Sequence, residues 1–387
     1  MINRQIQDEL LVCAKEYPAV TILGPRQSGK TTLAQMTFPN HVYCSLEDPD
    51  ARRQANEDPR GLLSKFSSGV ILDEIQRVPS LLSYLQGIID KNSKHGQFIL
   101  TGSHQPQVHQ AVTQSLAGRT AVLELLPFSI EEIKQYKRPV PSPFEMILQG
   151  FYPRLHEDQL RPGRFFSSYL STYIERDLRA MINLQDLTRF EQFLRLLAGR
   201  IGQLVNYTSL ANDIGVSSTT IKNWISVLKA SFILFELPPY FSNIRKRIVK
   251  SSKLYFIDVG LAAWLLGLQT SQQVQRDPLR GVLYENLLIL ETVKKLLNQG
   301  DQPLIYFYRD TKGNEVDLLI AAGRTFSAIE IKSAETFQPE FISGIENFKK
   351  TISQDIDVRG TVWYNGERKT EYKTINVHNP LAHGFKW

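Results

Sequence analysis

Residues 24–31 read GPRQSGKT and match the phosphate-loop pattern G-x-x-x-x-G-K-[ST] at every fixed position. The glycines let backbone amides turn toward phosphate oxygens, and the helix expected to follow adds partial positive charge. Lys30 is expected to reach the β- and γ-phosphates of ATP, and the Thr31 hydroxyl to hold Mg²⁺. The nucleotide-binding residues predicted from this site are Gly24, Pro25, Arg26, Gln27, Ser28, Gly29, Lys30, Thr31, Thr32 and Asp73.

Two carboxylates end the apolar stretch GVILDE at Gly69–Glu74. Asp73, at the expected strand end, is predicted to join Thr31 around Mg²⁺. Glu74, one residue further, is predicted to be the catalytic base that accepts a proton from the attacking water. A strand that ends in solvated acids is common by itself, but the phosphate loop upstream favours the catalytic interpretation.

Three further polar side chains are candidates for contact with the γ-phosphate. Thr101 and Ser103 follow the apolar stretch FIL, at a strand end where a hydroxyl would lie beside the attacking water. The alternative is an ordinary turn at the end of a strand. Arg119, in the segment SLAGRT, could stabilise transition-state charge in its own subunit or across an interface, and the alternative is a surface arginine.

These residues require a sheet that brings strand ends together. Short apolar runs at Ala19–Gly24, Val42–Leu46, Gly69–Asp73, Phe98–Gly102 and Ala121–Leu126 alternate with helical patterns such as Gln27–Phe38 and Pro79–Lys91. Strands that are apolar throughout indicate a parallel sheet covered on both faces. The predicted fold class is therefore α/β, with a parallel-sheet P-loop ATPase core.

At this point the sequence resembles a known family. The segments LGPRQSGKTTL, GVILDEIQRVPSLL, FILTGS, SLAGRTAVLELLPFS and YIERDL are similar to bacterial and archaeal AAA-type ATPases that carry a C-terminal domain of unknown function. The resemblance covers nearly the whole chain, and the order and spacing of the segments match. It implies the additional-strand class of P-loop ATPases, with the Asp73–Glu74 strand inserted between the phosphate-loop strand and its parallel neighbour. ATP sites in this class lie between subunits, which implies a homo-oligomer.

The middle of the chain has a helix-turn-helix pattern at Thr208–Ala230. A first helix is expected to end at Gly215, and Ser217 or Ser218 to cap a second helix that buries Ile221, Ile225 and Leu228. Expected strands at Phe232–Leu237 and Lys253–Ile257 enclose a basic segment that contains Arg245, Lys246 and Arg247. This pattern predicts a winged helix. Contact with nucleic acid and a purely structural packing role both remain open.

The last part of the chain predicts a second group of carboxylates. A helix at Gly281–Asn298 carries Glu285 in an apolar stretch, and strands at Glu315–Ala321 and Thr325–Ser333 carry Asp317, Glu330 and Lys332. This arrangement resembles the PD-(D/E)xK nuclease fold, which is restriction-endonuclease-like. Glu285, Asp317 and Glu330 would then bind Mg²⁺ or Mn²⁺, and Lys332 would act on the attacking water. The alternative is a set of ion pairs on a sheet surface.

Composition narrows the class of protein. With 387 residues, a net charge of +6 and no apolar stretch long enough to cross a bilayer, the sequence predicts a multidomain chain without a membrane segment. Two widely spaced cysteines fit the cytoplasm. The predicted domains are an ATPase core at 1–137, a helical lid at 138–200, a winged helix-turn-helix at 201–268 and a nuclease-like domain at 269–387.

Two functions follow from these predictions. The first is an ATPase that acts on DNA or RNA and has a metal-dependent nuclease-like domain at its C-terminal end. The second is an ATP-dependent switch or assembly platform, whose winged-helix and C-terminal domains bind partners without cleavage. The ATPase portion is common to both functions.

Overall fold

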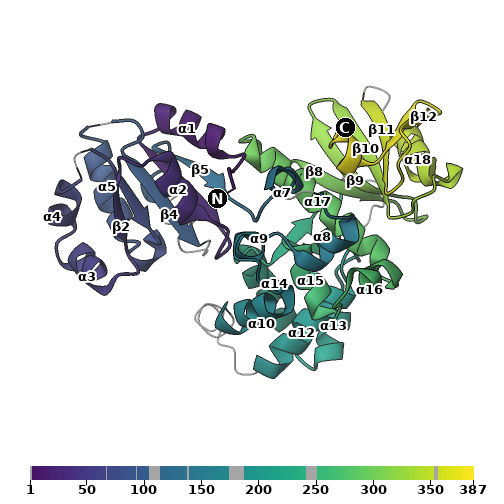
Figure 1. Cartoon of the computed structure of the whole chain (residues 1–387), viewed down its shortest axis with the longest axis horizontal. Helices are drawn as coiled ribbons and strands as arrows, with labels where there is room; N and C mark the ends of the chain where they lie inside the picture. Colours follow the sequence, from purple (N-terminus) through teal and green to yellow (C-terminus); the bar gives the residue numbers. More distant parts are fainter. Residues whose placement is uncertain are drawn as a thin grey trace.

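The computed structural model describes residues 2–66, 68–92, 94–103, 114–136, 139–173, 187–240, 251–352 and 356–387. Figure 1 shows three parts along the chain: an N-terminal α/β part, a helical middle and a C-terminal part built on a second sheet. The predicted basic segment with Arg245, Lys246 and Arg247 lies outside the described residues, as do most residues of the YIERDL segment. In the part of the chain that is described, no helix combines the length and apolar character needed to cross a membrane.

The N-terminal part is a parallel sheet covered by helices on both faces, as the apolar strands predict. Its described strands have the order β2-β3-β4-β1-β5, and each neighbouring pair is parallel. Helices α1 and α2 pack on one face of the sheet, and α4 and α5 lie on the other. The strands are β1 (Ala19–Gly24), β2 (Val42–Ser45), β3 (Val70–Asp73), β4 (Phe98–Ser103) and β5 (Thr120–Glu124). The helices are α1 (Gln7–Glu16), α2 (Lys30–Thr37), α3 (Pro49–Glu57), α4 (Pro59–Ser64), η1 (Ile75–Arg77) and α5 (Leu81–Ile89).

One prediction about this sheet is wrong. The strand that ends in Asp73 does not lie beside the phosphate-loop strand β1. Strand β4 lies between them, because it pairs with β1 along Ala19–Gly24 and with β3 along Val70–Leu72. The inserted strand is therefore β4, which carries Thr101, and Asp73 lies one strand further from the loop than expected.

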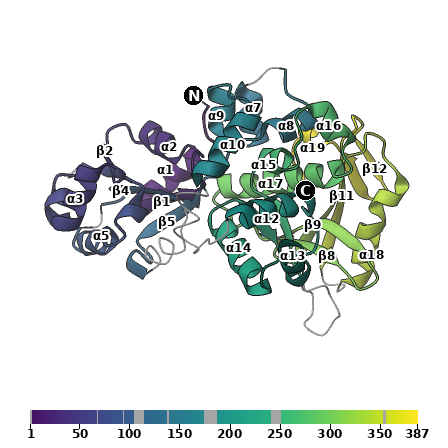
Figure 2. The same cartoon turned by 90° about the horizontal axis from the view of Figure 1, so that it is seen from below.

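The middle part is helical and shares one hydrophobic core with helix α7 (Ile130–Tyr136) and with α17 (Arg280–Asn298). Leu126 and Phe128, which follow β5 directly, already belong to this core, so the chain leaves the first sheet at the end of β5. Figure 2 shows the middle helices between the two sheets: the C-terminal part lies on one side of them and the N-terminal sheet on the other. The remaining elements are α8 (Pro143–Gln149), α9 (Pro153–Glu157), α10 (Pro162–Tyr173), α12 (Leu187–Gly199), α13 (Tyr207–Ile214), α14 (Ser218–Ala230), β6 (Leu234–Leu237), β7 (Lys253–Phe256), α15 (Val259–Leu265) and α16 (Ser271–Arg276).

Helices α13 and α14 occupy the segment with the predicted helix-turn-helix pattern. Gly215 ends α13 in the left-handed conformation with φ of 74°, and Ser217 caps α14 by accepting a hydrogen bond from the Thr220 amide. Ile221, Ile225 and Leu228 are buried as expected. Strands β6 and β7 follow as an antiparallel pair.

The C-terminal part is a mixed sheet with the described order β12-β13-β11-β10-β9-β8. Helix α17 packs on one face as part of the middle core, and α18 covers the other face. Gly323 has φ of 62° in the turn between β9 and β10, as the hairpin requires. The elements are β8 (Ile305–Arg309), β9 (Glu315–Ala322), β10 (Thr325–Lys332), η3 (Pro339–Ile342), α18 (Ser343–Thr351), β11 (Asp357–Tyr364), β12 (Thr370–Tyr372), β13 (Ile375–His378) and α19 (Pro380–His383).

Candidate functional site

The predicted phosphate loop joins the buried strand β1 to the start of helix α2. A Cβ atom at Gly24 would lie 2.2 Å from the Leu125 carbonyl oxygen, so a side chain does not fit there. Gly29 precedes α2 with φ of 92°, a conformation that glycine adopts without strain. The loop therefore opens on a helix N-terminus, where backbone amides bind phosphate. The other predicted loop residues lie between these glycines or in the first turn of α2: Pro25, Arg26, Gln27, Ser28 and Thr32.

Two buried side chains of the loop carry hydrogen-bonding atoms suited to phosphate. The Lys30 ammonium donates to the carbonyl oxygens of Gly24 at 3.1 Å and Pro25 at 2.7 Å. Burial lowers the pKa of Lys30 to about 8, although the carboxylates of Glu74 and Asp73 oppose the shift. The Ser28 hydroxyl oxygen is buried and has no hydrogen-bond partner among the described residues.

Asp73 lies at the end of β3 and meets the Thr31 hydroxyl, which donates to its carboxylate at 2.8 Å. Thr101 of β4 also donates to the Asp73 carboxylate, and Tyr43 of β2 donates to its second oxygen at 2.9 Å. A carboxylate beside a hydroxyl at the start of α2 supplies the hard oxygen ligands that Mg²⁺ prefers. The structure thus brings together the two residues predicted to hold Mg²⁺.

Glu74 follows directly, and its backbone is in the left-handed region with φ of 58°. Its carboxylate accepts a hydrogen bond from the side-chain amide of Gln76, and the Ser103 hydroxyl lies at 3.5 Å from it. The Glu74 amide donates to the Thr101 hydroxyl at 3.3 Å. Thr101 therefore contacts both acidic residues, and Glu74 is held by side chains from the next turn and the next strand.

Arg119 lies far from this group of residues. Its carbonyl oxygen accepts a hydrogen bond from the Ala19 amide, at the start of β1, whereas the phosphate loop follows the end of that strand. The length of β1 separates the two ends by about 16 Å. The guanidinium pairs with both oxygens of Asp90, at 2.6 and 3.1 Å. This placement argues against a role for Arg119 in the ATP site of its own subunit, while a role across an interface remains a prediction.

The C-terminal residues Asp317, Glu330 and Lys332 lie together, as the predicted hairpin register requires. The Lys332 ammonium is 3.1 Å from the Asp317 carboxylate and 2.6 Å from that of Glu330. Lys332, Lys253 and a backbone amide hold the pKa of Asp317 below its usual range against the effect of burial. Burial and the neighbouring Asp317 raise the pKa of Glu330 well above its usual range.

Glu285 lies 3.2 Å from a second lysine, Lys253 of β7, which the sequence prediction did not include. Its carboxylate also accepts a hydrogen bond from the Tyr255 hydroxyl. Among the described residues, no group of three His, Cys, Asp or Glu side chains is arranged to hold a metal ion. With ammonium groups between its carboxylates, the cluster does not fit the predicted Mg²⁺ or Mn²⁺ site.

Comparisons with known proteins identify the N-terminal part. The model of the AAA domain matches residues 16–134, and two domains of unknown function, DUF8612 and DUF4143, match residues 142–272 and 280–383. The protein Rv2008c of Mycobacterium tuberculosis is 31% identical over 328 residues, which cover 82% of this chain and 71% of that protein. The chain belongs to the same family as Rv2008c. Its N-terminal part is an AAA-type ATPase domain.

More distant similarities extend to archaea. The protein MJ1637 of Methanocaldococcus jannaschii is 25% identical over 242 residues, covering 60% of this chain and 48% of that protein. Among solved structures, the Walker-type ATPase paby2304 of Pyrococcus abyssi is 15% identical with a TM-score of 0.45, covering 68% of this chain and 96% of that one.

The residues of the AAA domain fit ATP and Mg²⁺. The loop offers the buried Ser28 hydroxyl and the Lys30 ammonium for phosphate, and Thr31 and Asp73 have their oxygens adjacent for the cation. A cavity of about 450 Å³ lies beside Gln27 of the loop. Its lining includes Arg154, Arg161 and Arg164, which belong to no contiguous motif; Arg154 is paired with Asp158 at 2.9 Å.

Arg4 also contacts the phosphate loop, although it lies in no sequence motif. Its guanidinium donates to the Ser28 carbonyl oxygen at 2.7 Å, to the Leu126 carbonyl oxygen at 2.7 Å and to the Glu132 carboxylate at 3.0 Å. The side chain is buried and lies over the Phe128 ring. Arg4 therefore ties the phosphate loop to the segment that leads into α7. Its position near the start of the chain, outside any motif, gave no signal of this role.

Proposed function

We propose that this protein is an ATP-dependent switch, in which the state of the phosphate loop is conveyed to the C-terminal part of the chain. Within the AAA domain, Lys30 and the loop amides bind the phosphates, and Thr31 and Asp73 hold Mg²⁺, which offsets charge on the transferred phosphoryl group. Glu74 accepts the proton of the attacking water. The hydrogen bond from Gln76 orients the Glu74 carboxylate for this step.

One observation carries the proposed coupling: a continuous series of buried polar contacts leads from the loop to helix α17. Arg4 binds the Ser28 carbonyl oxygen and the Glu132 carboxylate. Glu132 lies in α7, and its carboxylate accepts a hydrogen bond from the Ser129 backbone amide at 2.8 Å. The next backbone amide, that of Ile130, donates to the Glu291 carboxylate of α17 at 2.6 Å. Buried polar groups of this kind have few alternative partners, so movement of one is passed to the next.

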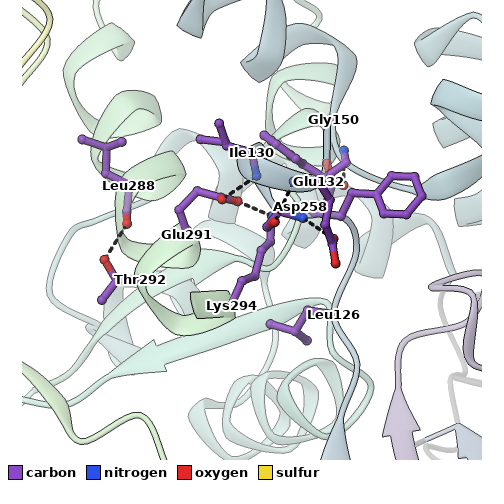
Figure 3. Close-up of polar contacts among 12 residues, drawn as sticks. Leu126, Ile130, Glu132, Gly150, Asp258, Leu288, Glu291, Thr292 and Lys294 are labelled. Carbon is purple, nitrogen blue, oxygen red and sulfur yellow. Dashed lines mark hydrogen bonds and ion pairs between the residues drawn. The ribbon is translucent and has the colours of Figure 1, made fainter. Parts of the chain in front are cut away.

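Lys294 completes the junction between α7 and α17, as Figure 3 shows. The Lys294 ammonium donates to Glu291 at 2.7 Å and to the Phe128 carbonyl oxygen at 2.8 Å. It also lies 3.9 Å from the centre of the Phe151 ring. Glu132, Glu291 and Lys294 are all buried, so this junction is part of the core between the parts of the chain. It connects the segment that follows β5, at Phe128 and Ile130, to the long helix α17.

Hydrogen–deuterium exchange of the full chain tests the coupling. Binding of a non-hydrolysable ATP analogue with Mg²⁺ should change amide protection in α7 and α17 as well as in the loop. Glu132→Gln should retain the change in the loop and reduce the change in α17. Glu131→Gln is the matched control, because Glu131 lies in the same helix but is exposed and pairs only with Lys134 among the ion partners described. An unchanged response of α17 in Glu132→Gln would contradict the proposed route.

Action on nucleic acid is the second candidate function. It is supported by the helix-turn-helix geometry of α13 and α14, by the β6–β7 pair that follows, and by the net charge of +6. We propose a winged helix whose basic segment, with Arg245, Lys246 and Arg247, contacts phosphates of DNA or RNA. Neutralising these three residues together should weaken binding to all sequences and reduce its salt dependence. Unchanged affinity would favour the switch without a nucleic-acid partner.

A further inference from the structure

Lys253 is a residue of the middle part whose side chain lies inside the carboxylate cluster of the C-terminal part. It begins strand β7, pairs with Leu237 of β6 and is only 3% exposed. Its ammonium is 3.2 Å from the Glu285 carboxylate of α17 and 2.5 Å from the Glu315 carboxylate of β9. The ammonium also lies 5.4 Å from the centre of the Phe307 ring.

The other carboxylates of the cluster also lie beside cationic side chains. Lys332 binds Asp317 and Glu330, and Arg309 lies 3.2 Å from the second oxygen of Glu315. Asp317 also accepts a hydrogen bond from the Ile331 backbone amide at 2.8 Å. Each of the four carboxylates thus has a cationic partner within 3.2 Å. At least one oxygen of each carboxylate is therefore directed at an ammonium group, and Glu285 also accepts a hydrogen bond from the Tyr255 hydroxyl.

Helix α18 closes the cluster from the other side. A Cβ atom at Gly344, near the start of this helix, would lie 2.2 Å from a carboxylate oxygen of Glu330 and 2.0 Å from the Glu315 carbonyl oxygen. This close approach leaves no room at Gly344 for even one more carbon atom. The backbone of α18 therefore lies against Glu330, on the hairpin that carries Asp317 and Lys332.

From these contacts we infer that the Lys253 ammonium takes the place of a divalent cation among Glu285, Glu315 and Asp317. A buried carboxylate group needs positive charge, and here a lysine of the middle part supplies it. The C-terminal domain of this chain is consequently a metal-free joint, locked to the middle part by the side chain of Lys253. Removal of that side chain leaves the buried Glu285 and the half-buried Glu315 beside Asp317 with too little positive charge, which a divalent cation can restore.

Titration with Mn²⁺, followed by the loss of the free-ion electron paramagnetic resonance signal, tests this inference. The Asp73→Asn variant of the full chain, without nucleotide, serves as the reference protein because it removes the cation ligand of the AAA domain. We expect no bound Mn²⁺ in the reference protein. Adding Lys253→Met should create Mn²⁺ binding, and further addition of Asp317→Asn should abolish it. Lys222→Met, which removes an exposed lysine of α14, is the matched control and should bind no Mn²⁺.

Two results would overturn the inference. One is Mn²⁺ binding by the reference protein that disappears on Asp317→Asn, since the cluster would then hold a metal with Lys253 present. The other is a folded Lys253→Met variant, verified by circular dichroism, that binds no Mn²⁺. If Lys253→Met does not fold, Lys253→Gln keeps a polar side chain and is measured in the same way. Mn²⁺ binding by the reference protein that depends on Asp317 would overturn the inference even without a variant of Lys253.

Discussion

Binding of ATP should depend on pH through Lys30, the buried ammonium of the phosphate loop. Burial lowers its pKa to about 8 in the nucleotide-free protein. Phosphate next to Lys30 favours the charged form and raises this pKa. Nucleotide binding is therefore expected to take up a proton above pH 8, and the affinity should fall as the pH rises.

The size of the effect follows from the two pKa values. With a pKa of about 8, roughly nine-tenths of Lys30 is charged at pH 7 and roughly one-tenth at pH 9. If bound nucleotide restores the usual pKa of 10.5, nearly all of the complex is charged at both pH values. ATP affinity should then fall about tenfold from pH 7 to pH 9, which corresponds to about 1.4 kcal/mol.

Calorimetric titration with a non-hydrolysable ATP analogue and Mg²⁺ measures the nucleotide affinity at each pH directly. Titrations at pH 9 in two buffers of different ionisation enthalpy should report uptake of nearly one proton for each nucleotide bound. Lys30→Arg is the control, because its guanidinium stays charged throughout this range and its affinity should not show the decrease. Equal affinity of the parent at both pH values, without proton uptake, would refute the reasoning.

The same pKa shift has the opposite effect on the nucleotide-free protein. Because the unfolded chain holds the Lys30 proton more tightly, this residue makes the free energy of unfolding rise as the pH increases from about 8 to 10.5. Nucleotide affinity falls over the same range. Comparison of urea unfolding of the parent and Lys30→Met as a function of pH separates this contribution from those of other groups.

Three further predictions follow from the structure. Glu74→Gln should bind ATP normally but lose turnover by about 10²–10⁴-fold, measured as phosphate release, and turnover at the parent rate would exclude Glu74 as the base. Lys294→Met should lower the free energy of unfolding by about 3–5 kcal/mol, because it leaves Glu291 buried without its cation, and parent-like denaturant unfolding would contradict this. If Arg119 acts across an interface, mixing Arg119→Ala with Glu74→Gln subunits should restore ATPase activity, whereas no recovery would limit it to its ion pair with Asp90.

The sequence predicted local elements well because their determinants are contiguous. The apolar strands, the loop glycines and the cap at Ser217 each depend on a few adjacent residues, and all appear in the structure. The order of the strands in the sheet could not be predicted from the sequence in the same way. Strands β3 and β4 are both short and apolar, so their composition does not show which of them pairs with β1.

In the candidate sites too, local sequence signals predict individual residues but not which distant residues come together. The phosphate-loop pattern predicts Thr31, and the position at the end of an apolar stretch predicts Asp73, so each residue of this contact has a local signal in the sequence. Arg119 is predicted to act at the phosphates because it lies in a short polar loop, but the parallel pairing of β5 with β1 puts it at the start of these strands, whereas the phosphate loop follows the end of β1. Lys253 belongs to a different predicted domain from Asp317, and no local pattern shows that a lysine in β7 reaches the C-terminal cluster.

Helix α17 connects the two proposals, because it carries both Glu285 and Glu291. They are six positions apart, so their Cα atoms lie about 9 Å apart along the helix axis. Both carboxylates are buried and paired with lysines, Lys253 at one site and Lys294 at the other. A densely packed helix held in this way cannot absorb a displacement by local rearrangement. Movement of α7 against Glu291 would therefore displace Glu285 relative to Lys253, and the joint between the middle and C-terminal parts is where a change in the phosphate loop would emerge.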